Sequence, residues 1–343
     1  MLSVNLKQIA EAAGVSLATA SRVLSGSDYP VKEELRTRVL QVASDLDYVP
    51  NAKARSLLRG ASSMVGVIVG DVSDPYFSAM IGGIHAAATK SRYMVTIVNT
   101  YRDPAAELEA IRALHAHRVD ALIVAGSGLT DPDYQAGLRK RVMSYARSGK
   151  GAVLVGHHEL GGDAPVSRIL MDSVAAGRQM AEHLRDLGHR HVALLTADTP
   201  LLSTLDRTQG FREVLGDGLL CHPVAPTRDG GYGGTLEVLE RYPEVTAIAA
   251  TADQMALGAL VALRERGIDV PGQMSVSGFN DIDISKDLVP ALTSVHLPLW
   301  MAGEKALALG LAALAGDIQE VRLESTLAVR ESTGPARAEQ LLP

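Results

Sequence analysis

The chain has 343 residues, of which 47% are apolar and 21% charged, and its formal net charge is −6. These are ordinary globular values, and the length predicts two or three domains with sizeable cores. The single cysteine, Cys221, excludes an internal disulfide and a cysteine-based metal site. The longest apolar run, Ala306–Ala315, is far short of the ~20 residues that cross a bilayer, and the first residues lack a signal-peptide pattern, so we expect a cytoplasmic protein with no membrane partner.

The charge is divided unevenly along the chain. Residues 1–60 contain eight Lys/Arg and six Asp/Glu, a net +2, so the remaining residues must carry −8 to give the total of −6. This asymmetry is compatible with a short segment that faces nucleic acid, attached to an acidic body.

The basic segment has the pattern of a helix-turn-helix followed by a third helix. Asn5 with Gln8 forms a capping-box start, and Gly14 ends the first helix. Ser16 caps a second helix with one apolar and one mostly polar face. The apolar positions of the three helices are Leu6, Ile9, Ala10 and Ala13; then Ala20, Val23 and Leu24; then Leu35, Val39, Val42, Ala43 and Leu46. From the pattern alone, a three-helix cap without a nucleic-acid role stays open.

Several motifs of this segment resemble the headpiece of the LacI/GalR family of bacterial repressors. They are Leu6-Lys7-Gln8-Ile9-Ala10, Ala13-Gly14-Val15-Ser16, Thr19-Ala20-Ser21-Arg22-Val23-Leu24, Tyr48-Val49-Pro50-Asn51 and Ala54-Arg55-Ser56-Leu57. The resemblance extends over sixty residues in both residue type and spacing. It implies a headpiece that reads operator DNA.

The resemblance also implies roles for individual residues. Leu17, Ala18 and Arg22 would face base edges in the major groove, and Arg22 is the expected guanine reader. The phosphate contacts would come from Ser16, Thr19 and Ser21. Residues 51–59 would form a hinge helix that orders on DNA, with Asn51 at its start, Leu57 wedged into the minor groove and Ala54 beside it. A packing role for Leu57 is the alternative.

From Met64 onward, short apolar runs alternate with helical stretches. The runs read as buried parallel strands at Val65–Val69, Val95–Val98, Ala121–Val124, Ala152–Val155, Val192–Leu195, Ala247–Ala250 and Ser275–Gly278. Helices are expected after Pro75, Pro104, Asp172, Ser203, Gly230 and Ala252. The fold class is therefore α/β with doubly wound parallel sheets, and so many βα units predict two sheets.

The family resemblance covers this body as well, through Asp74-Pro75-Tyr76-Phe77, Leu187-Gly188-His189-Arg190-His191, Asp253-Gln254-Met255-Ala256-Leu257-Gly258 and Gly278-Phe279-Asn280-Asp281. It implies a two-lobed sensor of the periplasmic-binding-protein type, with chain crossings near Asp163, Val295 and Leu323. We expect a headpiece at 1–50, a hinge and linker at 51–62 and a ligand-binding and dimerisation domain at 63–343. Lobe 1 would comprise about 63–163 and 295–322, and lobe 2 about 164–294 and 323–343.

Ligands of such sheets bind at the carboxyl ends of the strands, here between the lobes. The expected ligand-binding residues are Asp71, Tyr76, Phe77, His157, Asp172 and Asn280, together with Arg207, which the resemblance implies contacts the ligand. An exposed helical arginine is the alternative for Arg207. Asp74 is expected to cap a helix, with Pro75 at its first position. The chain departs from the family pattern at Ala252, where sugar-responsive members have Asn, at Asn280, where Asp is common, and at Gly156-His157-His158.

The sequence therefore predicts a transcription regulator, a repressor, that binds a pseudo-palindromic operator as a homodimer under the control of a small effector. The leading effector class is a sugar or sugar derivative, and a nucleoside or purine is the alternative. A solute-binding protein without DNA function is a further alternative. We find no paired acid and base, cofactor fingerprint or metal-spaced histidines, so we expect no enzyme activity, cofactor or metal. The tail after Ser332 lacks leucine heptads, so we expect no tetramerising coiled coil.

Overall fold

The structure of the chain is a computed structural model that describes residues 4–25, 29–48, 62–161 and 164–337. The chain divides into two compact units, residues 1–63 and 64–343. In the described parts of both units, no helix combines the length and the apolar character that crossing a membrane requires.

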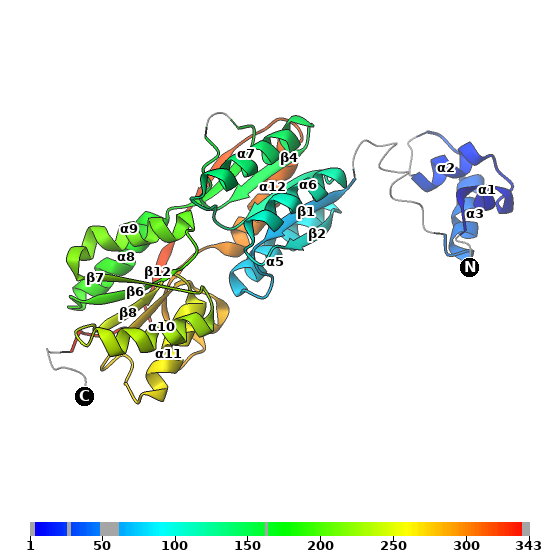
Figure 1. Cartoon of the computed structure of the whole chain (residues 1–343). Coiled ribbons are helices and arrows are strands. Elements are labelled where there is room, and N and C mark those ends of the chain that lie inside the picture. The colour runs from blue at the N-terminus through cyan, green and yellow to red at the C-terminus, as the bar shows by residue number, and fades with distance from the viewer. Residues whose placement is uncertain (1–3, 26–28, 49–61, 162–163, 338–343) are drawn as a thin grey trace. The chain divides into compact units, whose positions relative to one another are not determined.

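The described part of the first unit contains three helices, α1 (Leu6–Ala12), α2 (Leu17–Ser25) and α3 (Glu33–Asp45) (Figure 1). The expected capping box is confirmed: Asn5 N donates to Gln8 Oε1 at 2.8 Å, and Gln8 N donates to Asn5 Oδ1 at 3.1 Å. Gly14 has a φ of +63° in the turn between α1 and α2, a left-handed conformation that favours glycine. The buried core comprises Ile9, Ala10, Ala13, Ala20, Val23, Val39 and Ala43. Leu46, expected on the buried face, is 40% exposed because α3 has already ended.

The second unit contains two six-stranded sheets, each covered by helices on both faces (Figure 1). The first sheet has the order β11-β5-β4-β3-β1-β2 and is parallel throughout. Its strands are β1 (Met64–Val69), β2 (Met94–Asn99), β3 (Ala121–Ala125), β4 (Gly151–Val155), β5 (Ser167–Met171) and β11 (Glu320–Leu323). We call this sheet and its helices lobe 1.

The second sheet has the order β12-β10-β9-β8-β6-β7, and only β12 runs antiparallel to its neighbour. Its strands are β6 (Val192–Ala197), β7 (Leu219–Val224), β8 (Ala247–Ala250), β9 (Ser275–Asn280), β10 (Thr293–His296) and β12 (Thr326–Ala328). This sheet and its helices form lobe 2.

Eight α-helices complete the described part of the second unit. Lobe 1 has α5 (Pro75–Ser91), α6 (Pro104–Ala116), α7 (Pro132–Arg147) and α12 (Leu299–Ala313); lobe 2 has α8 (Ser173–Asp186), α9 (Leu202–Leu215), α10 (Arg228–Arg241) and α11 (Asp253–Glu265). Short 3₁₀ turns lie at Gly216–Gly218 and Asp283–Lys286. Helices α5 and α12, α8 and α9, and α10 and α11 pack as pairs.

The first chain crossing lies later than the sequence predicted. β5 pairs with β4 through Val153 and Ser167, so the chain leaves lobe 1 after Met171 and not near Asp163. The cause is that β5 contains Ser167 and Arg168, which hide it from a search for apolar runs. The second crossing follows β10, and the third lies between β11 and β12.

All seven predicted strands and six predicted helices are present, with ends shifted by up to three residues. The elements that the sequence did not reveal are α7, α12, β5, β7, β10, β11 and β12. The glycine-rich run at 230–234 lies inside α10, the helix that follows β7. Its glycines let α10 approach α11: a Cβ on Gly231 would lie 2.0 Å from the carbonyl oxygen of Met255.

This close approach gives a matched pair of stability predictions. Gly231→Ala should destabilise the second unit by roughly 1–3 kcal/mol, because the new methyl group has no space against the backbone of α11. Gly233→Ala, two residues away in the same helix with no neighbour within 4 Å of its Cβ position, should instead stabilise α10 by up to ~1 kcal/mol. Urea denaturation of both variants measures the difference. Equal effects of the two substitutions would contradict the packing explanation.

Candidate functional site

The described residues of the first unit present one candidate surface, the outward face of α2. Leu17 is 52% exposed at the start of α2, and Ala18 and Arg22 are also on the accessible side. The hydroxyl of Ser16 accepts from Thr19 N at 3.1 Å and lies 2.9 Å from Thr19 Oγ1, so Ser16 caps the helix as expected. This face offers side chains to a groove without disturbing the core beneath it.

Arg22 has a partner that sequence reasoning missed. Its guanidinium lies over the ring of Tyr29, 4.1 Å from the ring centroid. This stacking orients a side chain that would otherwise be free to rotate. Asn51, Ala54 and Leu57 lie outside the described residues.

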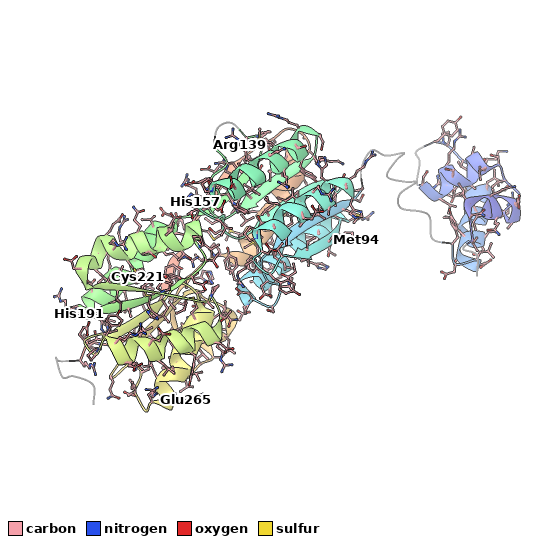
Figure 2. The ribbon with its side chains drawn as sticks, in the orientation of Figure 1. Met94, Arg139, His157, His191, Cys221 and Glu265 are labelled. Atoms are coloured by element: carbon pink, nitrogen blue, oxygen red, sulfur yellow. The ribbon has the colours of Figure 1, made fainter. Side chains whose placement is uncertain are left out.

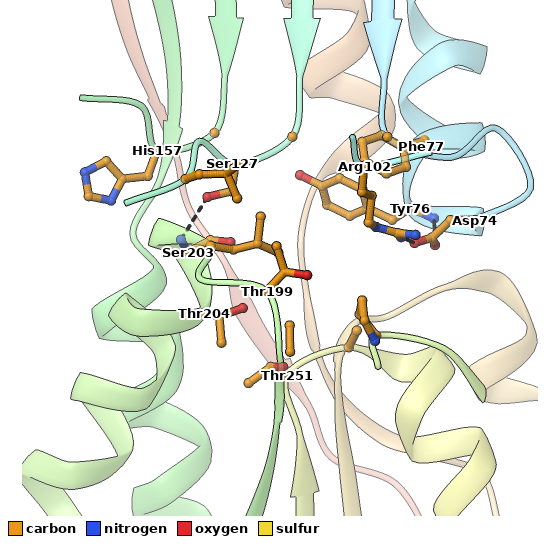
Figure 3. A pocket seen from close by; sticks show the side chains of 18 of the residues that line it. Asp74, Tyr76, Phe77, Arg102, Ser127, His157, Thr199, Ser203, Thr204 and Thr251 are labelled. Atoms are coloured by element: carbon orange, nitrogen blue, oxygen red, sulfur yellow. Dashed lines mark hydrogen bonds and ion pairs between the residues drawn. The ribbon is translucent and has the colours of Figure 1, made fainter. Parts of the chain in front are cut away.

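The second unit has a cavity of about 130 Å³ between its two lobes. A water molecule needs roughly 10–15 Å³ of such space, so the cavity can hold a small ligand. Its walls come from the carboxyl ends of strands in both sheets and the first turns of the helices that follow, as expected for this architecture. Figure 3 shows this cavity and the side chains around it.

The lobe 1 wall of the cavity is aromatic. Tyr76 and Phe77 lie in the first turn of α5, with their rings edge to face and 4.9 Å apart. Asp74 caps this helix through Tyr76 N at 3.0 Å, with Pro75 at its first position, which confirms the expected capping role. The cap fixes where the two rings enter the cavity.

An arginine that we did not predict completes this wall. Arg102 Nη2 donates to Asp74 Oδ2 at 2.7 Å, and its Nη1 lies 3.8 Å from Asp71 Oδ2. Burial raises the pKa of the Asp74 carboxyl, whereas Tyr76 N and Arg102 act in the opposite direction. Arg102 follows β2 closely, so its position after a strand end was the signal that could have identified it.

Arg207 on α9 forms the lobe 2 wall and is only 8% exposed. Its guanidinium stacks on Phe279, 4.6 Å from the ring centroid, and its Nη1 donates to the carbonyl oxygen of Thr251. Its Nε has no hydrogen-bond partner in the described structure, and burial lowers the pKa of the guanidinium. A buried cation with an unused donor is costly, so the site is prepared for an acceptor atom from a ligand.

Asn280 provides the opposite chemistry at the end of β9. Its Oδ1 is buried and has no hydrogen-bond partner in the described structure. Its backbone has a φ of +103°, a strained conformation for a residue other than glycine. The cavity wall therefore contains one unmet acceptor as well as one unmet donor.

Hydrogen bonds join the lobes along one rim of the cavity. His157 Nδ1 lies 2.7 Å from Asp206 Oδ2, and this hydrogen bond with Asp206 raises the pKa of His157. Ser203 N donates to Ser127 Oγ at 2.9 Å, as the dashed line in Figure 3 marks. His157 thus lines the cavity and also connects lobe 1 to α9 of lobe 2.

A carboxyl group in the first turn of α6 also lines the cavity and was not predicted. Glu107 Oε1 accepts from Tyr134 Oη at 2.6 Å, and both residues belong to the cavity wall. Burial raises the pKa of Glu107, which the hydrogen bond from Tyr134 opposes. No local pattern marks Glu107 in the sequence, because it lies inside a helix whose first turn happens to reach the cavity.

Five of the seven expected ligand-binding residues line the cavity, namely Tyr76, Phe77, His157, Arg207 and Asn280. Asp71 and Asp172 do not line it. Asp71 accepts from Ser73 N at 2.9 Å and Ser73 Oγ at 2.7 Å, and the latter bond lowers the pKa of Asp71. Asp172 caps α8 through Ala175 N at 2.9 Å. Within the described residues, no group of three or more His, Cys, Asp or Glu is placed to hold a metal ion.

Asp253 lies directly behind the cavity and is completely buried at the start of α11. Its carboxylate accepts from Ser294 Oγ at 2.7 Å, Ile282 N at 2.8 Å and Ser285 Oγ at 3.2 Å. These bonds fix the loop that follows Asn280. Burial raises the pKa of Asp253 to about 7, because desolvation outweighs the three hydrogen bonds.

Two family models match the chain. Residues 5–51 match bacterial regulatory proteins of the lacI family, and residues 62–313 match periplasmic binding proteins and the sugar-binding domain of the LacI family. The HTH-type transcriptional regulator GalR of Escherichia coli (strain K12) is 34% identical over 313 residues, which is 90% of this chain and 88% of GalR.

Solved structures extend the similarity to almost the whole chain. The lac repressor dimer bound to operator and the anti-inducer ONPF has a TM-score of 0.83 at 25% identity, covering 97% of this chain and all of the repressor chain. A complex of the transcriptional regulator CelR with cellobiose has a TM-score of 0.69 at 27% identity, covering 96% and 99% of the two chains.

The raised pKa of Asp253 predicts a specific pH dependence. A carboxyl whose pKa is higher in the folded state stabilises the fold fully below its unfolded pKa, near 4, and this contribution is lost as the pH rises through about 7. Between pH 5 and pH 8 the parent chain should lose about 2–3 kcal/mol more stability than Asp253→Asn, at 1.36 kcal/mol per pKa unit. Denaturant unfolding of the second unit at both pH values measures this. Parallel pH profiles for the two chains would refute it.

Proposed function

The chain belongs to the LacI family of bacterial regulatory proteins, and from this membership we propose that it represses transcription by binding a pseudo-palindromic operator as a homodimer, with a sugar in the inter-lobe cavity as its effector. The chain is a DNA-binding transcription regulator in which a helix-turn-helix unit precedes a two-lobed sensor. We assign it no catalytic role, and we place it in the cytoplasm, where the DNA lies.

The observation that supports a sugar most directly is the presence of an unmet donor and an unmet acceptor in one cavity. A sugar hydroxyl both donates and accepts, so the hydroxyls of one ring would satisfy Arg207 Nε and Asn280 Oδ1 together. The apolar face of the ring would lie against Tyr76 or Phe77. CelR, a relative of similar fold, binds a ligand of this class in its complex with cellobiose.

The charge balance of the cavity argues for a neutral sugar over a phosphorylated one. Arg102 is already paired with Asp74, and His157 is already paired with Asp206. Glu107 contributes a carboxyl group with only a neutral partner, Tyr134. The one remaining cation of the wall, Arg207, is offset by Glu107, so the described wall has no excess of positive charge to bind a phosphate.

On DNA, we propose that Leu17, Ala18 and Arg22 contact base edges, whereas Ser16, Thr19 and Ser21 contact phosphates. The exposure of α2 supports this division, because Leu17, Ala18 and Arg22 are exposed whereas Thr19 and Ser21 are half-buried. Asn51, Ala54 and Leu57 would complete the contacts in the minor groove.

The DNA-binding proposal is tested on an operator selected from a randomised duplex library with the full-length chain. Arg22→Ala should cost ~1–3 kcal/mol on that operator and relax the preference at one base pair. Lys53 belongs to the expected hinge segment 51–59, and we expect its ammonium group to bind a phosphate. Lys53→Ala should therefore weaken all duplexes alike and reduce the salt slope by about 1 per subunit. Fluorescence anisotropy at several salt concentrations separates the two effects. Failure to enrich any two-fold symmetric sequence would refute the proposal.

The effector proposal is tested by a thermal-shift screen of sugars, sugar phosphates, nucleosides and bases, followed by calorimetry on the best ligand. Arg207→Ala should lower its affinity by roughly 1.5–3 kcal/mol, or about 10- to 150-fold, because a charged donor is lost. Asp172→Asn is the control, since Asp172 lies outside the cavity wall, and should bind like the parent. A nucleoside or base as the only ligand would replace the sugar assignment, and unchanged affinity in Arg207→Ala would remove Arg207 from the site.

A further inference from the structure

The amino-terminal edge of the lobe 1 sheet gathers exposed cations from three helices. In a parallel sheet, each connecting helix ends near the amino end of the next strand. Lys90 and Arg92 lie at the end of α5, Arg118 lies after α6 and Arg147 ends α7. All four side chains belong to exposed residues, and none forms an ion pair within the described residues.

The strand register places these cations on one short edge. Met64 pairs with Met94, Val65 with Ala121, and Ala121 with Gly151, so β2, β1, β3 and β4 begin at nearly the same level. Neighbouring strands lie about 4.8 Å apart, so the edge from β2 to β4 spans roughly 14 Å. Figure 2 labels Met94 at this edge.

Two of these cations occupy backbone conformations that normally require glycine. Arg92 has a φ of +58° and Arg118 a φ of +55°, each just after the end of its helix. Glycine is the usual residue there because a Cβ is strained in the left-handed region. An arginine at such a position loses backbone stability, and two such residues on one edge point to a role for their side chains.

Lobe 2 has the same architecture and provides an internal comparison. The corresponding left-handed positions after its helices are glycines: Gly188, Gly216 and Gly267. Two helix-end cations of lobe 2 also have acidic neighbours: Arg185 lies 2.9 Å from Asp186, and Arg241 lies 3.9 Å from Glu237. Strained, unpaired arginines are thus a property of the lobe 1 edge and not of this fold in general.

The chain enters lobe 1 at this same edge. Met64 is the first residue of β1, and its carbonyl oxygen accepts from Asp120 N at 2.8 Å, beside Arg118. Residues 46–63 separate this point from the end of α3, the last of the described helices of the first unit, and a segment of that length spans at most roughly 65 Å. DNA bound by those helices therefore remains tethered within reach of the cationic edge.

We infer that the edge formed by Lys90, Arg92, Arg118 and Arg147 is a second DNA-contacting surface, which binds the phosphate backbone of the duplex that the helix-turn-helix holds. This inference rests on the DNA-binding function proposed above. Phosphates are read without regard to sequence, so the edge adds affinity and salt dependence but no base preference. It also gives the acidic second unit one face that DNA does not repel.

The test uses the full-length chain with Arg92 and Arg118 both replaced by glycine. Glycine relieves the backbone strain, so the melting temperature of the double variant should stay equal or rise. Its affinity for the selected operator and for a random-sequence duplex should fall by at least roughly 10- to 30-fold at about 0.15 M salt, and the slope of log K against log salt should become shallower by nearly 2 for each subunit that binds. The double variant Arg92→Asn/Arg118→Asn, which tolerates the same backbone conformation, should behave alike.

The matched control replaces two exposed cations at the helix ends of lobe 2, Arg241→Ala/Arg266→Ala, with the same change in net charge. It should leave both duplex affinities and the salt slope near those of the parent. An equal loss in this control would reduce the effect to total charge and overturn the inference. Unchanged DNA binding in the glycine variant would overturn the second DNA-contacting surface but not the proposed function. A parent chain that binds no duplex would overturn both.

Discussion

The direction of parallel strands is the constraint on which the rest of this structure depends. Because strands of one sheet run the same way, every loop that follows a strand lies at one edge, and every helix returns to the other. In both lobes the carboxyl edges face the shared cavity, so Tyr76 after β1, His157 after β4 and Asn280 at the end of β9 meet there although the chain separates them widely. The amino edges collect the helix ends and their cations.

The cavity combines groups that would be unfavourable in a sealed protein core. Arg207 retains an unmet donor and Asn280 an unmet acceptor, and a buried polar atom without a partner costs about 1–3 kcal/mol. The surrounding structure holds them in place: Phe279 supports the guanidinium, and Asp253 pins the loop beyond Asn280. A ligand that forms hydrogen bonds with both atoms therefore removes this cost, and the gain contributes to the free energy of ligand binding.

The sequence was sufficient wherever local chemistry alone determines the structure. The capping box at Asn5, the Asp74-Pro75 helix start and the fully apolar strands all form as their residue types predict. The sequence did not predict the role of a residue where that role is determined by a partner distant in the sequence. The role of Asp206 depends on its hydrogen bond with His157 across the cavity, and the role of Glu107 depends on its hydrogen bond with Tyr134. Asp172 shows the reverse error, since a carboxylate after a strand can cap the next helix as readily as bind a ligand.

The location of the crossings limits how an effector can reach DNA. The cationic edge and the entry of the chain at Met64 both belong to the lobe 1 sheet, joined by backbone hydrogen bonds through Asp120. A movement of lobe 2 against lobe 1 would leave these two features fixed to each other, because both belong to the lobe 1 sheet. Within one chain, such a movement therefore does not change how the lobe 1 edge is placed relative to the point where the chain enters lobe 1. In the proposed homodimer, if the subunits contact each other through both lobes, the same movement would change the spacing between the two lobe 1 edges, and a duplex of fixed geometry would respond to that spacing. Under the proposal made above, effector control would therefore act through the second subunit.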